Sequence, residues 1–402
     1  MSDAESGYAG RTNTLSFHER PVFPRGYRCA SRNCGLKPAG YDLSIFCSEV
    51  PASAAALFTR NRFPGAPVIV GRELIQRGRL RAVVVNSKVS NVGTGETGIL
   101  NARRMGIAAS VELGIPADEV LMSSTGVIGK QLPIEKIEAG MAGMAAELGD
   151  DPLRGAEGIM TTDTYAKALS MAVGDAVITW VGKGSGMIEP NLATMLVYMF
   201  TDARLEAGAL DRLLRNAVEN SFNMLSVDSD TSTSDTCLLM ANGLAGEVDE
   251  GVFREALRAG CIRFTEMLAR DGEGATKLLR ATVTGAANRE EARRVAKSII
   301  NSPLVKTMAF GADPNTGRVL MAVGKCTDVV QDPARISIWI NETRVFHEGT
   351  RAEYDEEGLR EELAGDPVDI RVDLQVGDAS ATAYGCDLTH GYIDENAAYY
   401  SS

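Results

Sequence analysis

The chain has 402 residues, more than one small domain normally holds, so two or three domains or one large two-lobed unit are expected. Hydrophobic residues make up 45% of it and charged residues 23%, an ordinary balance for a globular protein with a sizeable core. The formal net charge of −12 argues against nucleic acid and anionic membranes as partners.

The N-terminus and the cysteines indicate the compartment. Residues 1–16 are polar, lack the apolar centre of a signal peptide and are expected to form a flexible tail. No stretch has the apolar length of a membrane helix. Seven cysteines are scattered along the chain, and His18, His347 and His390 are too dispersed in sequence for a metal site. We therefore expect a cytoplasmic protein with reduced thiols and no metal.

Strands and helices are mixed in the first half of the chain. Buried strands are predicted where apolar and β-branched residues run together, at 66–70, 82–86 and 119–122. Helices are predicted over 98–113, after a glycine-rich turn, and over 134–148, before the breaker Gly149-Asp150-Asp151-Pro152.

The same mixture continues in the second half. Apolar residues recur at helical spacing over 205–222, 253–268 and 292–300, and a charged helix is predicted at about 355–363. Apolar residues alternate with polar or charged residues at 336–340 and 368–374, which predicts strands with one solvent-exposed face. Because the chain shows no Pro- or Ser-rich linker and no internal repeat, the fold class is α/β or α+β with at least two layers of each element.

One stretch, residues 183–200, offers chemistry. It passes from a glycine-rich turn through Pro190 to an apolar run, with Thr194 among small or apolar neighbours. Cleavage of the Ala193–Thr194 bond would make the Thr194 hydroxyl a nucleophile and its own α-amine the adjacent base. Such an amine has an ordinary pKa of roughly 8, so it exchanges a proton near neutrality. By itself, the pattern also fits a Gly/Pro loop that leads into a strand with a buried threonine.

Six further short sequence motifs occur along the chain together with this stretch. They are Ser124-Thr125-Gly126-Val127-Ile128-Gly129, Met160-Thr161-Thr162-Asp163-Thr164, Ser226-Val227-Asp228-Ser229-Asp230-Thr231-Ser232-Thr233-Ser234-Asp235, Gly272-Glu273-Gly274-Ala275, Ser302-Pro303-Leu304-Val305-Lys306-Thr307 and Tyr384-Gly385-Cys386-Asp387-Leu388-Thr389. Together, over most of the chain, they resemble the ornithine acetyltransferase (glutamate N-acetyltransferase) family of arginine biosynthesis, whose members cut themselves before such a threonine.

The resemblance implies a fold and an assembly. It implies two intertwined lobes, with stacked β-sheets flanked by helices. It also implies an α chain, 17–193, that carries the oxyanion hole and ends at the cleavage site. The β chain, 194–402, would carry the nucleophile and bind the substrate. Two α and two β chains would form a heterotetramer.

The resemblance also assigns roles to single residues. The Thr125 hydroxyl and the Gly126 N–H would form the oxyanion hole, two donors aimed at developing negative charge. Lys183 would meet the substrate carboxylate and Glu273 its amine, although each charge taken alone is typical of an ordinary surface. The substrate-binding positions are Thr161, Lys183, Thr194, Glu273, Asn396 and a hydroxyl near the C-terminus, which is Ser401 by ungapped counting or else Ser402.

The implied reaction is a ping-pong transfer that needs no cofactor. Thr194 takes the acetyl group from N-acetylornithine, and the resulting ester passes it to glutamate. Use of acetyl-CoA as a donor stays open. Three alternatives also stay open: a related self-cleaving acyltransferase of a specialised pathway with another acceptor, an aminopeptidase or amidohydrolase in which water takes the acyl group, and an uncut binding protein.

Two positions depart from the family pattern. Thr316 stands where the family usually has Trp, and loss of an indole near the site would widen it or change its substrate. Glu189 stands where Ala is common, and its charge would either tune processing or select a basic substrate.

Overall fold

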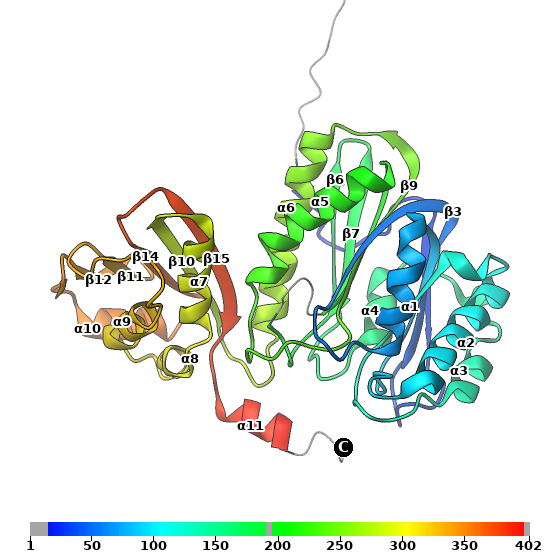
Figure 1. The fold of residues 1–402 in the computed structure, drawn as a ribbon, viewed down its shortest axis with the longest axis horizontal. Coiled ribbons are helices and arrows are strands. Elements are labelled where there is room, and N and C mark those ends of the chain that lie inside the picture. The colour runs from blue at the N-terminus through cyan, green and yellow to red at the C-terminus, as the bar shows by residue number, and fades with distance from the viewer. Residues whose placement is uncertain (1–14, 190–194, 398–402) are drawn as a thin grey trace, which may run out of the picture.

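The computed structural model describes residues 15–189 and 195–397, which form two lobes (Figure 1). Within these residues, nine strands form the sheet of the larger lobe and six form the sheet of the smaller lobe. Helices flank both sheets (Figure 1). The predicted α/β class, with two lobes and two helix-flanked sheets, is confirmed.

The larger sheet contains strands from both sides of position 193. Its strands are β1 (Ser16–Phe17), β2 (Tyr27–Arg32), β3 (Leu43–Phe58), β4 (Arg79–Asn86), β5 (Val120–Ser124), β6 (Lys167–Val173), β7 (Ala176–Lys183), β8 (Leu196–Arg204) and β9 (Thr236–Glu247). They lie in the order β1-β6-β7-β8-β9-β3-β4-β5, with β2 paired to β3. The β7 strand is antiparallel to β8, and β8 is parallel to β9. A cut after residue 193 would therefore divide this sheet between two chains.

The smaller sheet confirms the two strands predicted in the C-terminal part. Its strands are β10 (Leu278–Ala286), β11 (Ser337–Ile340), β12 (Thr343–His347), β13 (Thr350–Arg351), β14 (Val368–Asp373) and β15 (Ala379–Cys386). They lie in the order β13-β12-β11-β14-β10-β15.

Helices occupy most of the predicted helical segments. They are α1 (Ala66–Leu74), α2 (Gly95–Leu113), α3 (Ile134–Met141), α4 (Pro152–Ile159), α5 (Ala207–Glu219), α6 (Glu250–Arg270), α7 (Arg289–Ile300), α8 (Pro303–Phe310), α9 (Thr316–Gly324), α10 (Glu356–Leu363) and α11 (His390–Ala397). Across the described ranges, no helix has the length and apolar character needed to cross a bilayer.

The two lobes share one apolar core. The α6 helix packs against β6 and β7 of the larger sheet and against β10 and β15 of the smaller sheet. Trp180 of β7, Phe264 of α6 and Val283 of β10 belong to the same buried cluster. Their burial holds the lobes in a fixed relation because separating them would expose this apolar surface to water.

Two predictions of secondary structure were wrong. Residues 66–70 are not a strand but the start of α1, where Pro67 occupies the first turn. Proline suits that position because the first N–H groups of a helix have no partner within it. The helix predicted over 134–148 ends at Met141, and Gly143 then adopts a φ of +83° before a single 3₁₀ turn over Met144–Glu147. That backbone conformation is easy for glycine and interrupts a right-handed helix.

The contact between α6 and β7 predicts a stability effect. A Cβ atom on Gly260 would overlap the indole of Trp180, which is fully buried. We expect Gly260→Ala to lower the free energy of unfolding by about 1–3 kcal/mol through overpacking, measured by denaturant titration. Gly324→Ala is the matched control, since nothing lies within 4 Å of its added methyl group. Equal stability of the two variants would contradict the packing argument.

Candidate active site

The candidate site lies at one edge of the larger sheet. Lys183 at the end of β7 pairs with Leu196 at the start of β8, and Leu196 pairs with Thr236 at the start of β9. Thr125 and Gly126 follow directly after β5. Lys183 and the loop after β5 thus lie at the same edge of the sheet.

One pocket gathers the described residues of the predicted site. It has a volume of about 110 Å³ and is lined by Ser90, Thr125, Gly126, Ile128, Thr161, Thr162, Lys183, Gly186, Met187, Ser232, Thr233, Ser234, Glu273 and Asn396. The sequence had singled out Thr125, Gly126, Thr161, Lys183, Glu273 and Asn396, and all six are among them. Ala193, Thr194, Ser401 and Ser402 lie outside the described residues.

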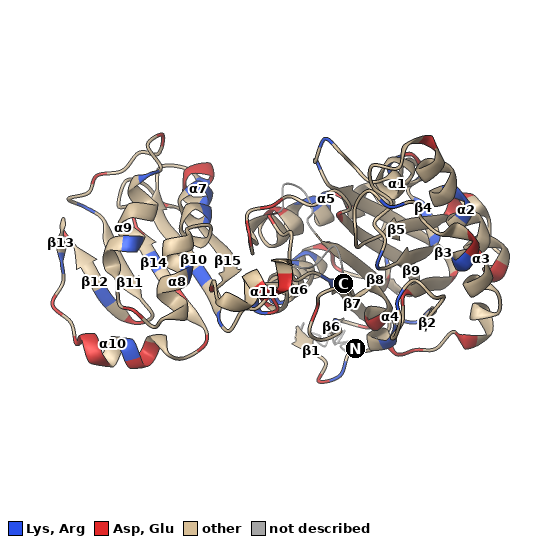
Figure 2. Ribbon diagram, turned by 90° about the horizontal axis from the view of Figure 1, so that it is seen from below, with Lys and Arg blue, Asp and Glu red and all other residues tan. Residues whose placement is uncertain are grey.

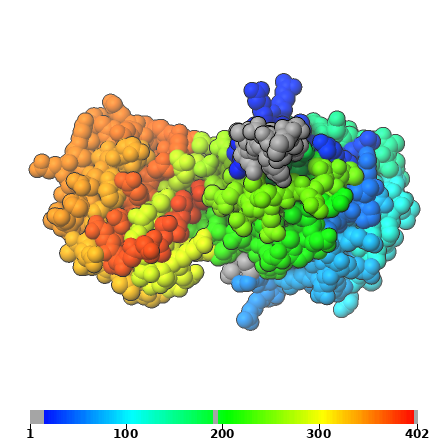
Figure 3. Space-filling view, turned by 90° about the horizontal axis from the view of Figure 1, so that it is seen from above, coloured from blue at the N-terminus to red at the C-terminus, as the bar shows by residue number. Residues whose placement is uncertain are grey.

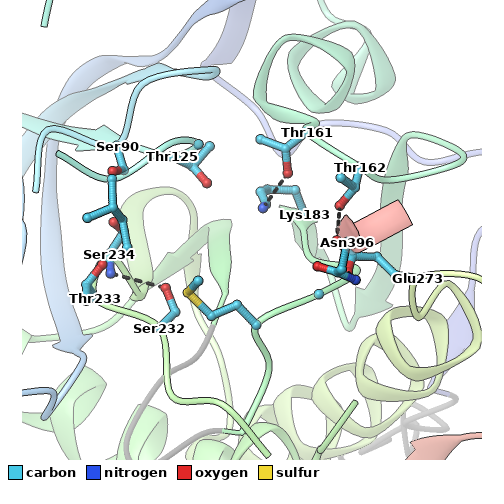
Figure 4. A pocket seen from close by; sticks show the side chains of 14 residues that line it. Ser90, Thr125, Thr161, Thr162, Lys183, Ser232, Thr233, Ser234, Glu273 and Asn396 are labelled. Carbon is cyan, nitrogen blue, oxygen red and sulfur yellow. Dashed lines mark hydrogen bonds between the residues drawn. The ribbon is translucent and has the colours of Figure 1, made fainter. Parts of the chain in front are cut away.

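The pocket has a cationic group and an acidic group. Figure 4 shows Thr125 on one side, Glu273 with Asn396 on the other, and Lys183 with Thr161 between them. The Lys183 ammonium donates to the Thr161 hydroxyl at 2.8 Å. Each oxygen of Glu273 accepts one hydrogen bond at 2.7 Å, from the Thr162 hydroxyl and from the Asn396 amide. Asn396 belongs to α11, the last described helix, which lies below the junction of the two lobes in Figure 1, and Asn396 is part of the pocket lining.

The loop after β5 presents two unused donors. The Thr125 N–H donates to the Asn86 carbonyl at 3.0 Å, which fixes the backbone. Gly126 has a φ of +124°, and a Cβ atom there would overlap the Lys88 backbone, so only glycine fits. Over the ranges 15–189 and 195–397, neither the Thr125 hydroxyl nor the Gly126 N–H has a hydrogen-bond partner. Both donors are therefore available for an oxyanion.

A buried ion cluster lies behind the pocket. Lys167 of β6 is fully buried and pairs with Asp163, at 2.7 Å, and with Asp271. Burial raises the pKa of Asp163, but Lys183, Lys167 and the Thr161 N–H outweigh it and bring the pKa to about 2. Because this pKa lies below the unfolded value of roughly 4, the ionised carboxylate stabilises the fold above that pH. This contribution is lost as pH falls toward the folded pKa.

Lys183 is coupled to this cluster. Burial lowers the pKa of Lys183, and the nearby Asp163 carboxylate opposes that shift. The N–H of the next residue, Gly184, donates to Asp163 at 2.7 Å. Lys183 is thereby held in place by its backbone while its ammonium faces the pocket.

Sequence reasoning missed several lining residues. Thr162 had been quoted only as part of the word 160–164, and Ser232, Thr233 and Ser234 only as part of the word 226–235. Ile128 had been quoted only as part of the motif 124–129, and Gly186 and Met187 only as part of the stretch 183–200, whereas Ser90 had received no role. The only sequence signal for the serines and threonines was that they cluster in the motif 226–235. Such a cluster is as typical of a turn as of a binding site.

The two departures from the family pattern lie outside the pocket. Thr316 begins α9 in the smaller lobe and its hydroxyl lies 3.5 Å from that of Tyr354. It does not line the pocket that the described residues form, and its effect on the substrate stays a prediction. The Glu189 carboxylate accepts from Asn301 at 2.8 Å and lies 3.0 Å from the Lys297 ammonium of α7. Its two oxygens are thus engaged within the protein, and Glu189 does not line the pocket that the described residues form.

A pocket that sets a lysine and a glutamate near two available hydrogen-bond donors has the chemistry of an enzyme site for a small polar molecule. The model of the ArgJ family matches residues 28–401. A glutamate N-acetyltransferase of Streptomyces clavuligerus is 45% identical over 388 residues, which cover 94% of this chain and 98% of the relative. A bifunctional arginine biosynthesis protein of Thermotoga neapolitana is 41% identical over 393 residues, which cover 94% of this chain and 99% of the relative.

A solved structure is also similar. The ornithine acetyltransferase of Mycobacterium tuberculosis, in complex with ornithine, is 34% identical, with a TM-score of 0.43, and covers 45% of this chain and 100% of its own. From the family model and the close relatives, this chain belongs to the ArgJ family. It is an acyltransferase of amino-acid biosynthesis.

The Glu189–Lys297 pair predicts an energetic coupling. Burial lowers the pKa of Lys297 and Glu189 opposes that shift, so Glu189→Ala leaves a buried ammonium without its counter-ion. We expect the free energy of unfolding to fall by about 1–3 kcal/mol. The double variant Glu189→Ala with Lys297→Met should recover part of the loss, because the unpaired charge is gone. Thermal and denaturant melts of the two single variants and the double variant measure the free energies of unfolding. A loss in the double variant equal to the sum of the losses in the two single variants would refute the coupling.

Proposed function

We propose that the protein cuts itself between Ala193 and Thr194 and then moves an acetyl group from N-acetylornithine to glutamate through an ester on Thr194. The observation that carries the proposal is the pocket itself. It collects six residues that were singled out beforehand, and it lies at the start of β8, whose first residue follows Thr194 by two positions. The names of the close relatives, glutamate N-acetyltransferase and arginine biosynthesis bifunctional protein, support the same activity.

Cleavage is an intramolecular acyl shift followed by hydrolysis. The Thr194 hydroxyl attacks the Ala193 carbonyl, the peptide C–N bond breaks, and the hydroxyl proton goes to the departing amine. Water then hydrolyses the ester between Ala193 and Thr194. The products are an α chain, 17–193 after the tail 1–16, and a β chain, 194–402.

Transfer uses the new N-terminus twice. The Thr194 hydroxyl gives its proton to its own α-amine and attacks the acetyl carbonyl of N-acetylornithine. The Thr125 hydroxyl and the Gly126 N–H hold the oxyanion, and the amine returns the proton to the nitrogen of the leaving ornithine. The amine of glutamate then attacks the ester, and the same groups act in reverse order.

The two charged groups orient the substrate. Lys183 binds the carboxylate, Glu273 binds the side-chain amine of N-acetylornithine, and Thr161 and Asn396 hold these two groups in place. Ser401 or Ser402 adds a hydroxyl. No metal or organic cofactor takes part in these steps. A heterotetramer of two α and two β chains in the cytoplasm is the proposed assembly and location, with acetyl-CoA as a possible second donor.

The nucleophile is tested by Thr194→Ala. Both the hydroxyl and the base are lost, so we expect one uncut chain and loss of transfer by at least about 10⁴-fold, in the range seen for nucleophile removal. Intact mass under denaturing conditions checks the cut. The wild type should give two fragments, and incubation with N-acetylornithine alone should add one acetyl mass to the β fragment. A cut and active Thr194→Ala variant would contradict the proposal, and acetate release in place of acetylglutamate would point to a hydrolase.

The acidic group is tested by Glu273→Gln. The amide keeps the shape but turns one of the two acceptor atoms into a donor and loses the charge that attracts an amine, so KM for N-acetylornithine should rise about tenfold or more. Self-cleavage should be unchanged, because the substrate is absent from that step. Glu157→Gln, at an exposed position on α4, is the matched control. An unchanged KM in Glu273→Gln would show that this carboxylate does not bind the amine.

A further inference from the structure

A crevice lined by arginine side chains lies between the two lobes. It has a volume of about 260 Å³, and it shares no lining residue with the candidate pocket. Its lining comes from the end of α5 and the turn after it, from α6, from the first turns of α7 and from β15. The α7 helix and the β15 strand lie on the side of the smaller lobe that faces α6 (Figure 1). Both lobes therefore contribute to the crevice.

The lining of the crevice carries more positive than negative charge. It contains three arginines, Arg258, Arg289 and Arg293, and a single carboxylate, Glu219. The lining thus has an excess of two positive charges, although the formal net charge of the whole chain is −12. A hollow lined by charges of one sign concentrates their field and attracts ions of the opposite sign.

The ion pairs within the crevice leave guanidinium donors unused. The Arg293 side chain is 18% exposed and pairs with Glu219. The Arg258 Nε donates to Glu255, one turn earlier in α6, at 3.0 Å, and its two terminal nitrogens have no hydrogen-bond partner among the described residues. The Arg289 side chain has neither an ion-pair partner nor a hydrogen-bond partner in the part of the chain that the structure describes. Each lobe therefore supplies one guanidinium group with free donors.

A buried hydroxyl adds a further donor. Tyr384 of β15 lines the crevice and is 6% exposed, and its hydroxyl has no hydrogen-bond partner within 15–189 and 195–397. Burial and the nearby Glu266 raise the pKa of Tyr384 to about 12. Arg280 and Arg258 oppose that shift, so Arg258 lies within electrostatic range of this hydroxyl. The hydroxyl keeps its proton near neutral pH and can donate it to an anion.

We propose that this crevice binds a small dianion, a molecule with one phosphate group or two carboxylate groups. Arginine recognises both kinds of oxyanion through paired N–H···O hydrogen bonds. Two negative charges would balance the excess charge of the lining. The volume is below the range of roughly 300–1,000 Å³ that is usual for drug-sized ligands, which favours a phosphate or a short dicarboxylate. The inference uses no residue of the proposed catalytic steps and does not rest on the proposed function.

A bound dianion would join the two lobes. Arg258 belongs to α6 of the larger lobe and Arg289 to α7 of the smaller lobe. A ligand that accepts from both guanidinium groups adds charge-assisted hydrogen bonds across a junction that otherwise relies on the shared apolar core. Because such a ligand binds the folded state, it should also raise the melting temperature.

The test is calorimetric titration of the full-length protein with inorganic phosphate and with succinate, at constant ionic strength. We expect a Kd below about 1 mM for at least one of these probes. The double variant Arg258→Gln with Arg289→Gln should raise that Kd at least about tenfold, because charge-assisted hydrogen bonds are lost. Arg344→Gln removes the same charge at an exposed position of β12 outside the crevice, and this matched control should keep the affinity of the wild type.

The outcomes identify the ligand class or overturn the inference. Binding of phosphate but not succinate indicates a phosphate compound, and the reverse indicates a dicarboxylate. Both results support the inference when the double variant loses the binding. Binding of neither probe overturns it. Binding that the double variant retains also overturns it, because the anion then lies elsewhere, as at Lys183. If a thermal melt shows that the double variant is unfolded, Arg289→Gln alone decides, since that exposed side chain has no partner among the described residues.

Discussion

The geometry of the site depends on the buried cluster of Asp163, Lys167 and Asp271. Asp163 accepts from the backbone N–H groups of Thr161 and Gly184 and so fixes the residues on both sides of the Lys183 ammonium. Asp271 follows α6 by one residue and accepts from the backbone and the hydroxyl of Thr164.

Glu273 stands two residues further along from Asp271. Three separate segments, 161–164, 183–184 and 271–273, are thereby tied to the single fully buried ammonium of Lys167. Buried ion pairs rarely exceed apolar packing as a source of stability, so the value of this cluster lies in the relative position of the groups that it holds.

The same architecture accounts for how the fold would survive the proposed cut in the middle of a sheet. The segment before the gap is tied to the part of the chain after it, since Asp228 accepts from the N–H groups of Met187 and Ile188 and the Thr231 hydroxyl donates to the Glu189 carbonyl. The segment after the gap is held by the pairing of β8 with β7 and β9. None of these hydrogen bonds involves residue 193 or 194, so we expect both flanking segments to keep their positions after the proposed cut. The core shared through α6 keeps the two lobes together as well.

Sequence patterns predicted the elements in which an apolar repeat continues over many residues. They failed for short segments, whose conformation depends on the adjoining turns. The apolar stripes of α6 and α7 are long enough to fix their type. The apolar run at 66–70 is too short to distinguish a strand from a helix. Pro67 favours a helix only when it lies in the first turn, and the sequence alone does not show that a helix begins there.

The site follows the same rule. Six of its lining residues came from the resemblance to a family, whereas the place of Ser232, Thr233 and Ser234 in the lining depends on how the chain folds. The partner of Glu189, Lys297, stands more than one hundred residues along the chain, and no local pattern connects them.

The composition of the pocket lining fits a site that serves two substrates in turn. Under the proposed mechanism, the side chain of the first substrate ends in an amine and that of the second in a carboxylate. Fixed charges alone suit one of them and repel the other. The lining, however, is rich in hydroxyl groups, from Ser90, Thr125, Thr161, Thr162, Ser232, Thr233 and Ser234. A hydroxyl rotates to donate or accept, so it serves an amine and a carboxylate without a change of protonation. Thr162 already donates to Glu273 and can turn toward an incoming carboxylate instead. A single pocket with fixed charges and adaptable hydroxyls is thus chemically suited to both halves of a ping-pong transfer.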